Sequence, residues 1–171
     1  IDVKSGICPD IFGLGFKDHS LTKNAIDASD QDDAVNITTW PVWGMYQPDA
    51  IASFRMKGDD YYITANEGDA RDYDGFSEEV RVKDLALDGT AFPDASLQDD
   101  ENLGRLRVTN ALGNNDADPE FEQLFSYGAR SFSIWDEDGK LVFDSGDDFE
   151  QIIADLRPWD FNQTNDENDT I

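Results

Sequence analysis

Residues 131–144, SFSIWDEDGKLVFD, contain the clearest structural signal in the 171-residue sequence. Two runs rich in aromatic and branched side chains, 131–135 and 140–144, flank the segment 136–139, which ends in an Asp-Gly pair. Such a pair between two alternating runs is typical of a β-hairpin. The stretch therefore predicts two antiparallel strands joined by a tight turn.

A second hairpin is predicted upstream of the first. The runs 51–56 and 61–65 are rich in β-forming residues and are joined by 57–60, which contains a glycine. Shorter strands are predicted at 79–85 and at 103–108, where apolar and basic residues alternate as on a half-buried strand.

One helix is predicted near the C-terminal end, over residues 148–156. Its apolar residues recur with the spacing of one helical face, and they are Phe149, Ile152, Ile153 and Leu156. Pro158 ends the pattern. Short strands with long polar loops and one short helix predict a mainly β fold, either a sandwich or a propeller.

The composition is strongly acidic. Thirty-eight Asp and Glu oppose 13 Lys and Arg, which gives a formal net charge of −25. That charge argues against nucleic-acid and anionic-lipid partners, whose phosphates need Lys and Arg. It is consistent with saline surroundings, and it favours divalent cations or basic partners. With 39% hydrophobic residues, the chain has enough apolar material for a core.

Cysteine and histidine limit the chemistry. Cys8 is the single cysteine, so the chain has no internal disulfide or thiolate cluster. His19 is the single histidine, which excludes a multi-histidine zinc site and leaves a Ser-His-Asp triad conceivable only around His19 itself. It lies in the polar stretch 17–20 and is predicted to be a loop residue. No apolar run approaches the ~20 residues of a membrane span.

Six segments, taken together and in this order, resemble the choice-of-anchor I family of secreted bacterial proteins. The segments are 40–52, 65–73, 78–82, 102–106, 127–135 and 143–147. The resemblance implies a partial β-propeller of several antiparallel blades at an extracellular, periplasmic or cell-surface location. Members of this family are often labelled alkaline-phosphatase-like, a label that arises in part from domain fusion.

The resemblance also implies a domain organisation. Residues 1–171 would be a single fragment of a larger propeller, with a loop-rich entry at 1–40 and a polar, truncated tail at 162–171. The remaining blades would then be its partner in the full-length protein. Because a partial propeller has open sheet edges, we also expect self-association through those edges.

The densest polar segment is the loop that follows the second run of the upstream hairpin. It contains four carboxylates within eight residues, and these are Glu67, Asp69, Asp72 and Asp74. They are candidate ligands for Ca²⁺, which takes six to eight oxygens. Arg71 in the same loop could pair with one of them or bind an anion. A solvated loop with structural ion pairs is the alternative interpretation.

Two further groups are candidate sites. Arg71, Arg81 and Arg130 are expected either to pair with carboxylates in buried positions or to form an anion-binding cluster. A second acidic loop has alternating oxygen ligands at Asn114, Asp116, Asp118 and Glu122. Pro119 takes the place where an EF-hand needs glycine, so only a looser calcium site is predicted there.

Two functions follow from these observations. The first is a non-catalytic extracellular binding or surface module with possible calcium sites. The alternative is part of a metal-dependent phosphoester hydrolase of the alkaline-phosphatase or phytase-like kind, which needs no histidine. No catalytic residue is assigned.

Overall fold

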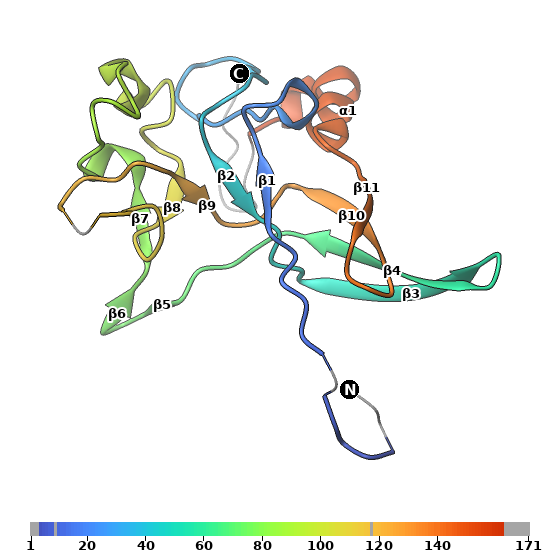
Figure 1. The fold of residues 1–171 in the computed structure, drawn as a ribbon. Helices are drawn as coiled ribbons and strands as arrows, with labels where there is room; N and C mark the ends of the chain where they lie inside the picture. Colours follow the sequence, from blue (N-terminus) through green and yellow to red (C-terminus); the bar gives the residue numbers. More distant parts are fainter. Residues whose placement is uncertain (1–3, 9, 117, 163–171) are drawn as a thin grey trace.

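Strands and long connections make up most of this computed structural model, which describes residues 4–8, 10–116 and 118–162 (Figure 1). One sheet has the strand order β1-β2-β9-β8-β7, a second β11-β10-β4-β3, and β5 pairs with β6. The fold class predicted from the sequence, mainly β with several antiparallel pairs and one helix, is confirmed. Most of the predicted tail, beyond residue 162, lies outside the described residues.

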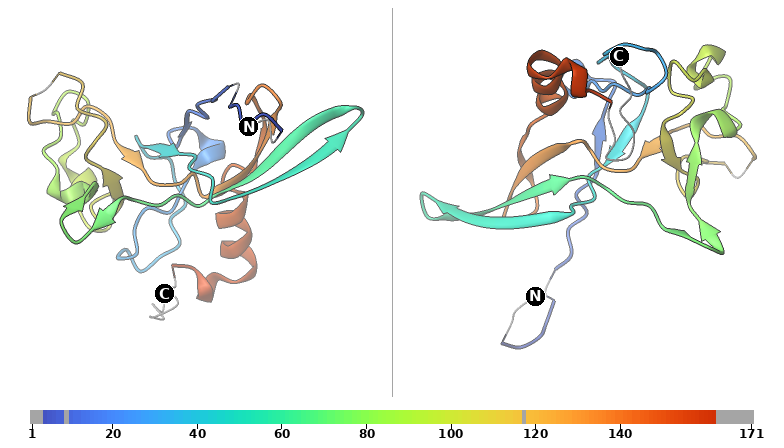
Figure 2. Two further views of the ribbon diagram at one scale, coloured as in Figure 1. Left: turned by 90° about the horizontal axis from the view of Figure 1, so that it is seen from below. Right: turned by 180° about the vertical axis from the view of Figure 1, so that it is seen from behind.

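Both predicted hairpins are present and share the four-stranded sheet. Its strands are β3 (Ala50–Met56), β4 (Asp59–Asn66), β10 (Ser131–Asp136) and β11 (Leu141–Asp144). β10 pairs antiparallel with β4 along its whole length, from Ser131 opposite Asn66 to Asp136 opposite Tyr61. The sheet therefore joins two hairpins that lie far apart in the sequence, and the β3–β4 ribbon projects from its side (Figure 2).

The five-stranded sheet is built from short strands. These are β1 (Phe16–Asp18), β2 (Trp43–Met45), β7 (Glu79–Arg81), β8 (Arg107–Thr109) and β9 (Phe125–Ser126), and β5 (Asp72–Tyr73) and β6 (Phe76–Ser77) form a separate ribbon. All pairs are antiparallel except β2 with β9. The main hydrophobic core cluster of the described residues contains Ile26, Ala28, Trp40, Val42, Val82, Phe92, Leu103, Leu106, Val108 and Leu124.

Two predicted strands are shorter than the sequence indicated. The segment 103–106 folds as a turn before β8, because Leu103 and Leu106 are both buried. Residues three apart face opposite sides of a strand, so an extended chain could not bury both in one core. A 3-10 turn, Val82–Asp84, likewise ends β7 and brings Leu85 against the same core.

The predicted helix forms as α1 (Asp148–Leu156). None of its residues is buried, and its apolar face remains exposed at Phe149, Ile152, Ile153 and Leu156. Three further 3-10 turns are Thr22–Asn24, Ala95–Gln98 and Pro158–Asp160. Within the described part of the chain, no helix has the length and apolar character that crossing a bilayer requires.

The buried face of β10 is polar rather than aromatic. Ser131, Ser133 and Trp135 point inward, while Phe132 and Ile134 are only partly buried. Both serine hydroxyls donate to one oxygen of Asp144, at 2.8 and 2.6 Å. The central strand of this sheet therefore packs through hydrogen bonds on one side.

Lys17 completes this buried network from β1. Its ammonium is 3.1 Å from an oxygen of Asp144. It also donates to the carbonyl oxygens of Ala129, at 3.0 Å, and Gly146, at 2.6 Å. An ammonium has three N–H groups, so these contacts use all of them. Desolvation lowers the pKa of Lys17, against the opposing effect of the Asp144 carboxylate.

An Asn and a Thr of β4 extend the network. The Asn66 amide donates to Ser131 and Ser133, at 3.1 and 2.7 Å, and its carbonyl accepts the Thr64 hydroxyl at 2.8 Å. Thr64 accepts in turn from the indole N–H of Trp135, at 2.9 Å. Among the described residues no buried side-chain nitrogen or oxygen lacks a partner, so the network is fully satisfied.

The β3 edge remains open. All seven β3 residues are exposed, and β3 is the last strand of its sheet. Unpaired strand edges are templates for pairing with another chain. Self-association through this edge stays a prediction.

Two glycines lie in contact where β4 ends and β10 begins. Gly68 and Gly128 both have left-handed backbones, with φ of +78° and +72°. A Cβ on Gly128 would overlap the carbonyl oxygen of Glu67, and one on Gly68 would overlap the backbone nitrogen of Gly128. Only glycine fits both the conformation and the space at these positions.

Gly128→Ala is therefore expected to lower the free energy of unfolding by at least about 2 kcal/mol, since it adds both a strained φ and a backbone overlap. Chemical denaturation followed by tryptophan fluorescence measures this. Gly75→Ala is the matched control, because a Cβ there meets nothing within 4 Å. Equal stabilities for the two variants would contradict the requirement for glycine at this junction.

Candidate functional site

The two sides of β7 and β8 have different chemistry. Val80 and Val82 on one segment, and Leu106 and Val108 on the other, belong to the main core or pack against it. Glu79, Arg81 and Arg107 alternate with these apolar residues and point the opposite way, because successive side chains of a strand alternate. Arg105 lies in the turn just before β8. The sheet thus presents a row of arginines on its outer face.

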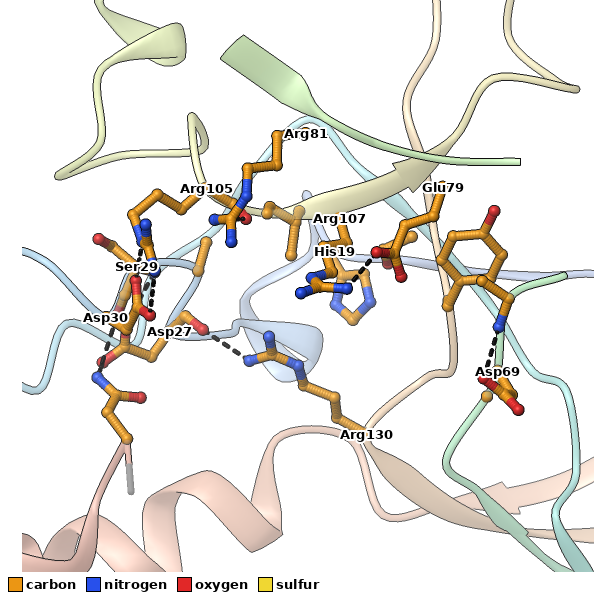
Figure 3. A pocket seen from close by; sticks show the side chains of 17 residues that line it. His19, Asp27, Ser29, Asp30, Asp69, Glu79, Arg81, Arg105, Arg107 and Arg130 are labelled. Carbon is orange, nitrogen blue, oxygen red and sulfur yellow. Dashed lines mark hydrogen bonds and ion pairs between the residues drawn. The ribbon is translucent and has the colours of Figure 1, made fainter. Parts of the chain in front are cut away.

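These arginines line the wall of a cleft of about 540 Å³. The segments 27–30 and 68–70 form further walls, and Arg130, which precedes β10, completes the lining. Figure 3 shows the guanidinium groups of Arg81, Arg107 and Arg130 pointing toward the middle of this cleft. The chain contains seven arginines, and four of them line this one cleft.

Three of the four arginines have carboxylate partners. Arg105 donates to both oxygens of Asp30, one of them at 2.8 Å, and Arg107 donates to Glu79. Arg130 donates to Glu150 of α1, at 2.9 Å. These pairs hold the side chains in place, and because they are partly exposed each contributes only about 0–1 kcal/mol to stability.

Arg81 differs from the other three. It donates to the carbonyl oxygen of Arg105, at 3.1 Å, and no carboxylate of a described residue forms an ion pair with it. It also lies directly opposite Arg107 in the antiparallel β7–β8 pair. Like charges at opposite positions destabilise a sheet. Arg81 is therefore the cleft arginine whose charge is not neutralised by an ion pair within the described part of the chain.

Arg130 is positioned by contacts from two sides. Its backbone is left-handed, with φ of 48°, which is uncommon for a residue with a side chain. It donates to the carbonyl oxygen of Asp27, at 2.6 Å, in addition to Glu150. Glu150 also accepts the backbone N–H of Asp27, at 2.6 Å. The helix α1 therefore orients the arginine and the 27–30 wall together.

A buried carboxyl group, Asp27, and an exposed one, Asp30, also line the cleft. Burial raises the pKa of Asp27, although backbone N–H groups of Asn36 and Ser29 act in the opposite direction. Hydrogen bonding from Arg105 lowers the pKa of Asp30 on the same wall. Neighbouring carboxyl groups thus differ in acidity because one is desolvated and the other is paired with a cation.

His19 lies in the turn after β1, as predicted, but its ring is buried, with 1% of the residue exposed. Nδ1 is 2.7 Å from the carbonyl oxygen of Asn24. Because a carbonyl only accepts, Nδ1 must carry the proton. A Cβ on Gly44 would lie 2.6 Å from Nε2, so a glycine is needed beside the ring. Burial lowers the pKa of His19 to about 4.

The structure separates the arginines that the sequence grouped. Arg81 and Arg130 line the cleft, and Arg71 does not. Arg71 pairs with Glu78, with one contact of 2.7 Å, and 64% of its side chain is exposed. The expectation of a buried pair is therefore wrong for Arg71. Its loop continues directly into β5, and both strands of the β5–β6 ribbon are exposed.

The carboxylates of the acidic loop 67–74 also lie in different surroundings. Asp69 lines the arginine cleft, while Asp72 and Asp74 line a separate shallow pocket with Tyr73. The backbone of Glu67 packs against Gly128. A calcium site built from Glu67, Asp69, Asp72 and Asp74 stays a prediction.

The second acidic loop is more compact. Asp116, Asp118 and Glu122 each place a carboxylate oxygen so that all three lie within 4.8 Å of one another, and among the described residues this is the one such group. Asn114 donates to the carbonyl oxygen of Asp118. Among the described residues, one oxygen of each carboxylate accepts a backbone N–H, which comes from Asp118, Glu120 or Asn115.

Arg105 and Arg107 are functional candidates that sequence reasoning missed. The alternation of basic and apolar residues over 103–108 was the available signal, and it was interpreted only as evidence for a half-buried strand. The same alternation at 79–82 would have placed Arg81 on a matching face. What remained hidden was that these two segments are neighbours.

The buried histidine predicts a pH dependence of stability. Its pKa is 6.5 when unfolded and about 4 when folded, so only the unfolded chain takes up a proton between these values. Stability is then complete above pH 6.5 and falls as the pH decreases toward 4. We expect a loss on the order of 2–3 kcal/mol from this residue.

Urea denaturation between pH 7 and pH 4 measures the effect by comparing the wild type with His19→Gln. Burial raises the pKa of Asp27, so its titration acts with the opposite sign, and the comparison cancels this contribution because both proteins retain Asp27. The slope with pH should be steeper in the wild type. Parallel curves would show that His19 is not held neutral by the fold.

Comparison with known proteins identifies the family of this chain. Searches of the curated proteins and of the solved structures returned no match. A family model does match, and its alignment covers residues 1–171. The resemblance noted from six sequence segments is thereby confirmed, and the chain belongs to the choice-of-anchor I domain family.

Proposed function

We propose that this chain acts at or outside the cell surface as a binding module, and that the arginine cleft is its ligand site for an anion. The family supports a secreted or cell-surface location. The proposal assigns no reaction to the chain. It extends the anion-binding alternative considered for Arg81 and Arg130 to a cleft that also contains Arg105 and Arg107.

The observation that carries the proposal is the concentration of arginine. A chain with a formal net charge of −25 places four of its seven arginines around one cleft. Guanidinium groups bind carboxylate, sulfate and phosphate groups through paired hydrogen bonds. An anion at Arg81 would relieve the repulsion between Arg81 and Arg107, which lie opposite each other.

Isothermal titration of the protein with sulfate and with phosphate at low ionic strength tests the site. Binding is expected, and Arg81→Gln should weaken it about tenfold, which corresponds to the loss of one charge-assisted hydrogen bond. Arg55→Gln is the matched control, because Arg55 forms an exposed ion pair with Asp60 on the β3–β4 hairpin. Equal weakening by both substitutions would indicate a general effect of net charge and would remove the site.

A calcium site in the loop 114–122 is a second candidate function. The grouping of Asp116, Asp118 and Glu122 supports it, since their carboxylate oxygens lie within 4.8 Å of one another and each carboxylate has one oxygen that accepts no backbone N–H of a described residue. Ca²⁺ prefers such ligands, and extracellular modules bind it at about 0.1–1 mM.

Ca²⁺ at millimolar concentration is expected to raise the melting temperature, because binding to the folded state alone stabilises it. The pair of substitutions Asp116→Asn and Asp118→Asn should abolish the shift. Asp138→Asn, in the turn of the β10–β11 hairpin, should leave it unchanged. A melting temperature that does not respond to Ca²⁺ in the wild type would exclude the site.

The phosphoester hydrolase remains the alternative. Metal-assisted hydrolysis requires the metal beside the bound phosphate. The three grouped carboxylates are not among the residues that line the arginine cleft, and the carboxylates that do line it form no such group among the described residues, which favours binding over hydrolysis. Hydrolysis of an aryl phosphate with Ca²⁺, lost on Arg81→Gln and kept on Arg55→Gln, would establish the alternative instead.

A further inference from the structure

We infer that the ligand of the arginine cleft is an acidic sugar, that is, a hydroxyl-rich molecule with one anionic group. This inference rests on the proposed function, because it takes the cleft as an anion site. It adds the chemical class of the ligand. Three features of the cleft carry it: size, charge balance and the distribution of hydrogen-bond acceptors.

The cleft is larger than a bare inorganic ion. The cleft measures about 540 Å³. Pockets that enclose whole organic ligands are typically about 300–1,000 Å³. A sulfate or phosphate group would occupy only the part beside the guanidinium groups, so the remainder of the cleft would surround the rest of a larger molecule.

The charge balance limits the number of anionic groups to one. Arg105, Arg107 and Arg130 already have carboxylate partners, and among the described residues Arg81 alone of the four has none. The cleft therefore has one cation outside its ion pairs. Asp27 and Asp69 also line the cleft and form no ion pair among the described residues, so Arg81 is the one arginine there that is available to an anionic group. The further charges of a polyanion would be repelled by the carboxylates of the walls, and this repulsion would exceed the attraction that Arg81 provides.

The walls beyond the arginines favour a ligand that donates hydrogen bonds, although Asp30 and Glu79 already accept from Arg105 and Arg107. Asp30, Asp69 and Glu79 line the cleft, and a carboxylate can only accept. They lie on three different segments, so the ligand needs donors at several points rather than one. A sugar ring presents hydroxyl groups in several directions, and these hydroxyls can donate to each carboxylate in turn.

The lining is also poor in apolar side chains. Ala28, Ala70 and Leu106 are the aliphatic residues among the described residues that line it. A fatty acid would gain little by entering, since burial of apolar surface needs apolar neighbours. Tyr127 offers one aromatic ring, which suits the apolar face of a single sugar ring.

Titration with matched pairs of probes tests the inference. The pairs are glucuronate with acetate, glucose 6-sulfate with sulfate, and glucose 6-phosphate with phosphate, and neutral glucose is added as a control. At least one sugar acid is expected to bind ten times more tightly than its hydroxyl-free partner, while glucose alone does not bind. The three pairs also identify which anionic group the cleft prefers.

Two variants separate the parts of the site. Asp69→Asn should weaken the preferred sugar acid about threefold to tenfold and leave binding of its bare partner unchanged, because it removes a charged acceptor and not a guanidinium. Arg81→Gln should weaken both members of the pair. Asp138→Asn, which removes one acid from a distant turn, should change neither.

The outcomes distinguish this inference from the proposed function. If the bare ions bind through Arg81 and no sugar acid binds more tightly, the anion site stands and the acidic sugar is wrong. If neither the ions nor the sugar acids bind, both proposals fail. If glycine or glutamate binds more tightly than glucuronate, the donors are ammonium groups and the sugar assignment is overturned.

Discussion

The contact between Lys17 and Asp144 is the constraint on which the rest of the described structure depends. Two charged side chains, each largely removed from water, are stable only when every remaining hydrogen-bonding group is paired. The ammonium meets this condition with two backbone carbonyls, and the carboxylate with Ser131 and Ser133. This network joins β1 of one sheet to β10 and β11 of the other, so the relative placement of the sheets is set by polar geometry.

The shape of the cleft depends on that hydrogen-bond network. Lys17 binds the carbonyl oxygens of Ala129 and Gly146, which lie next to Arg130 and just before α1. The same ammonium therefore fixes the arginine and the helix whose Glu150 pairs with it. Because a guanidinium binds an anion through directed hydrogen bonds, a small movement of either element would change the site. The candidate function thus rests on a buried ion pair that touches no ligand.

The distribution of charge separates the surface from the site. The net charge of −25 comes mainly from acidic loops, which interact favourably with water and salt. The cleft is lined by four arginines and four carboxyl groups, and Arg81 is the arginine that forms no ion pair with a carboxylate of a described residue. The negative electrostatic field of the whole chain slows the approach of an anion, while the guanidinium groups of the cleft attract it at short range. Because salt screens both interactions, it should speed the approach of the anion and weaken its contact with the guanidinium groups.

The sequence by itself determined the local elements. The Asp-Gly turn, the alternating runs and the helical spacing of Phe149, Ile152, Ile153 and Leu156 placed both hairpins and α1, because those patterns depend on neighbours within a few residues. Only the tertiary structure decided that serines rather than Phe132 face the interior of β10, that His19 is buried, and that Arg81 and Arg107 lie opposite each other. Each of these depends on a partner far away in the chain, and the periodicity of one segment contains no information about which distant segment will pack against it.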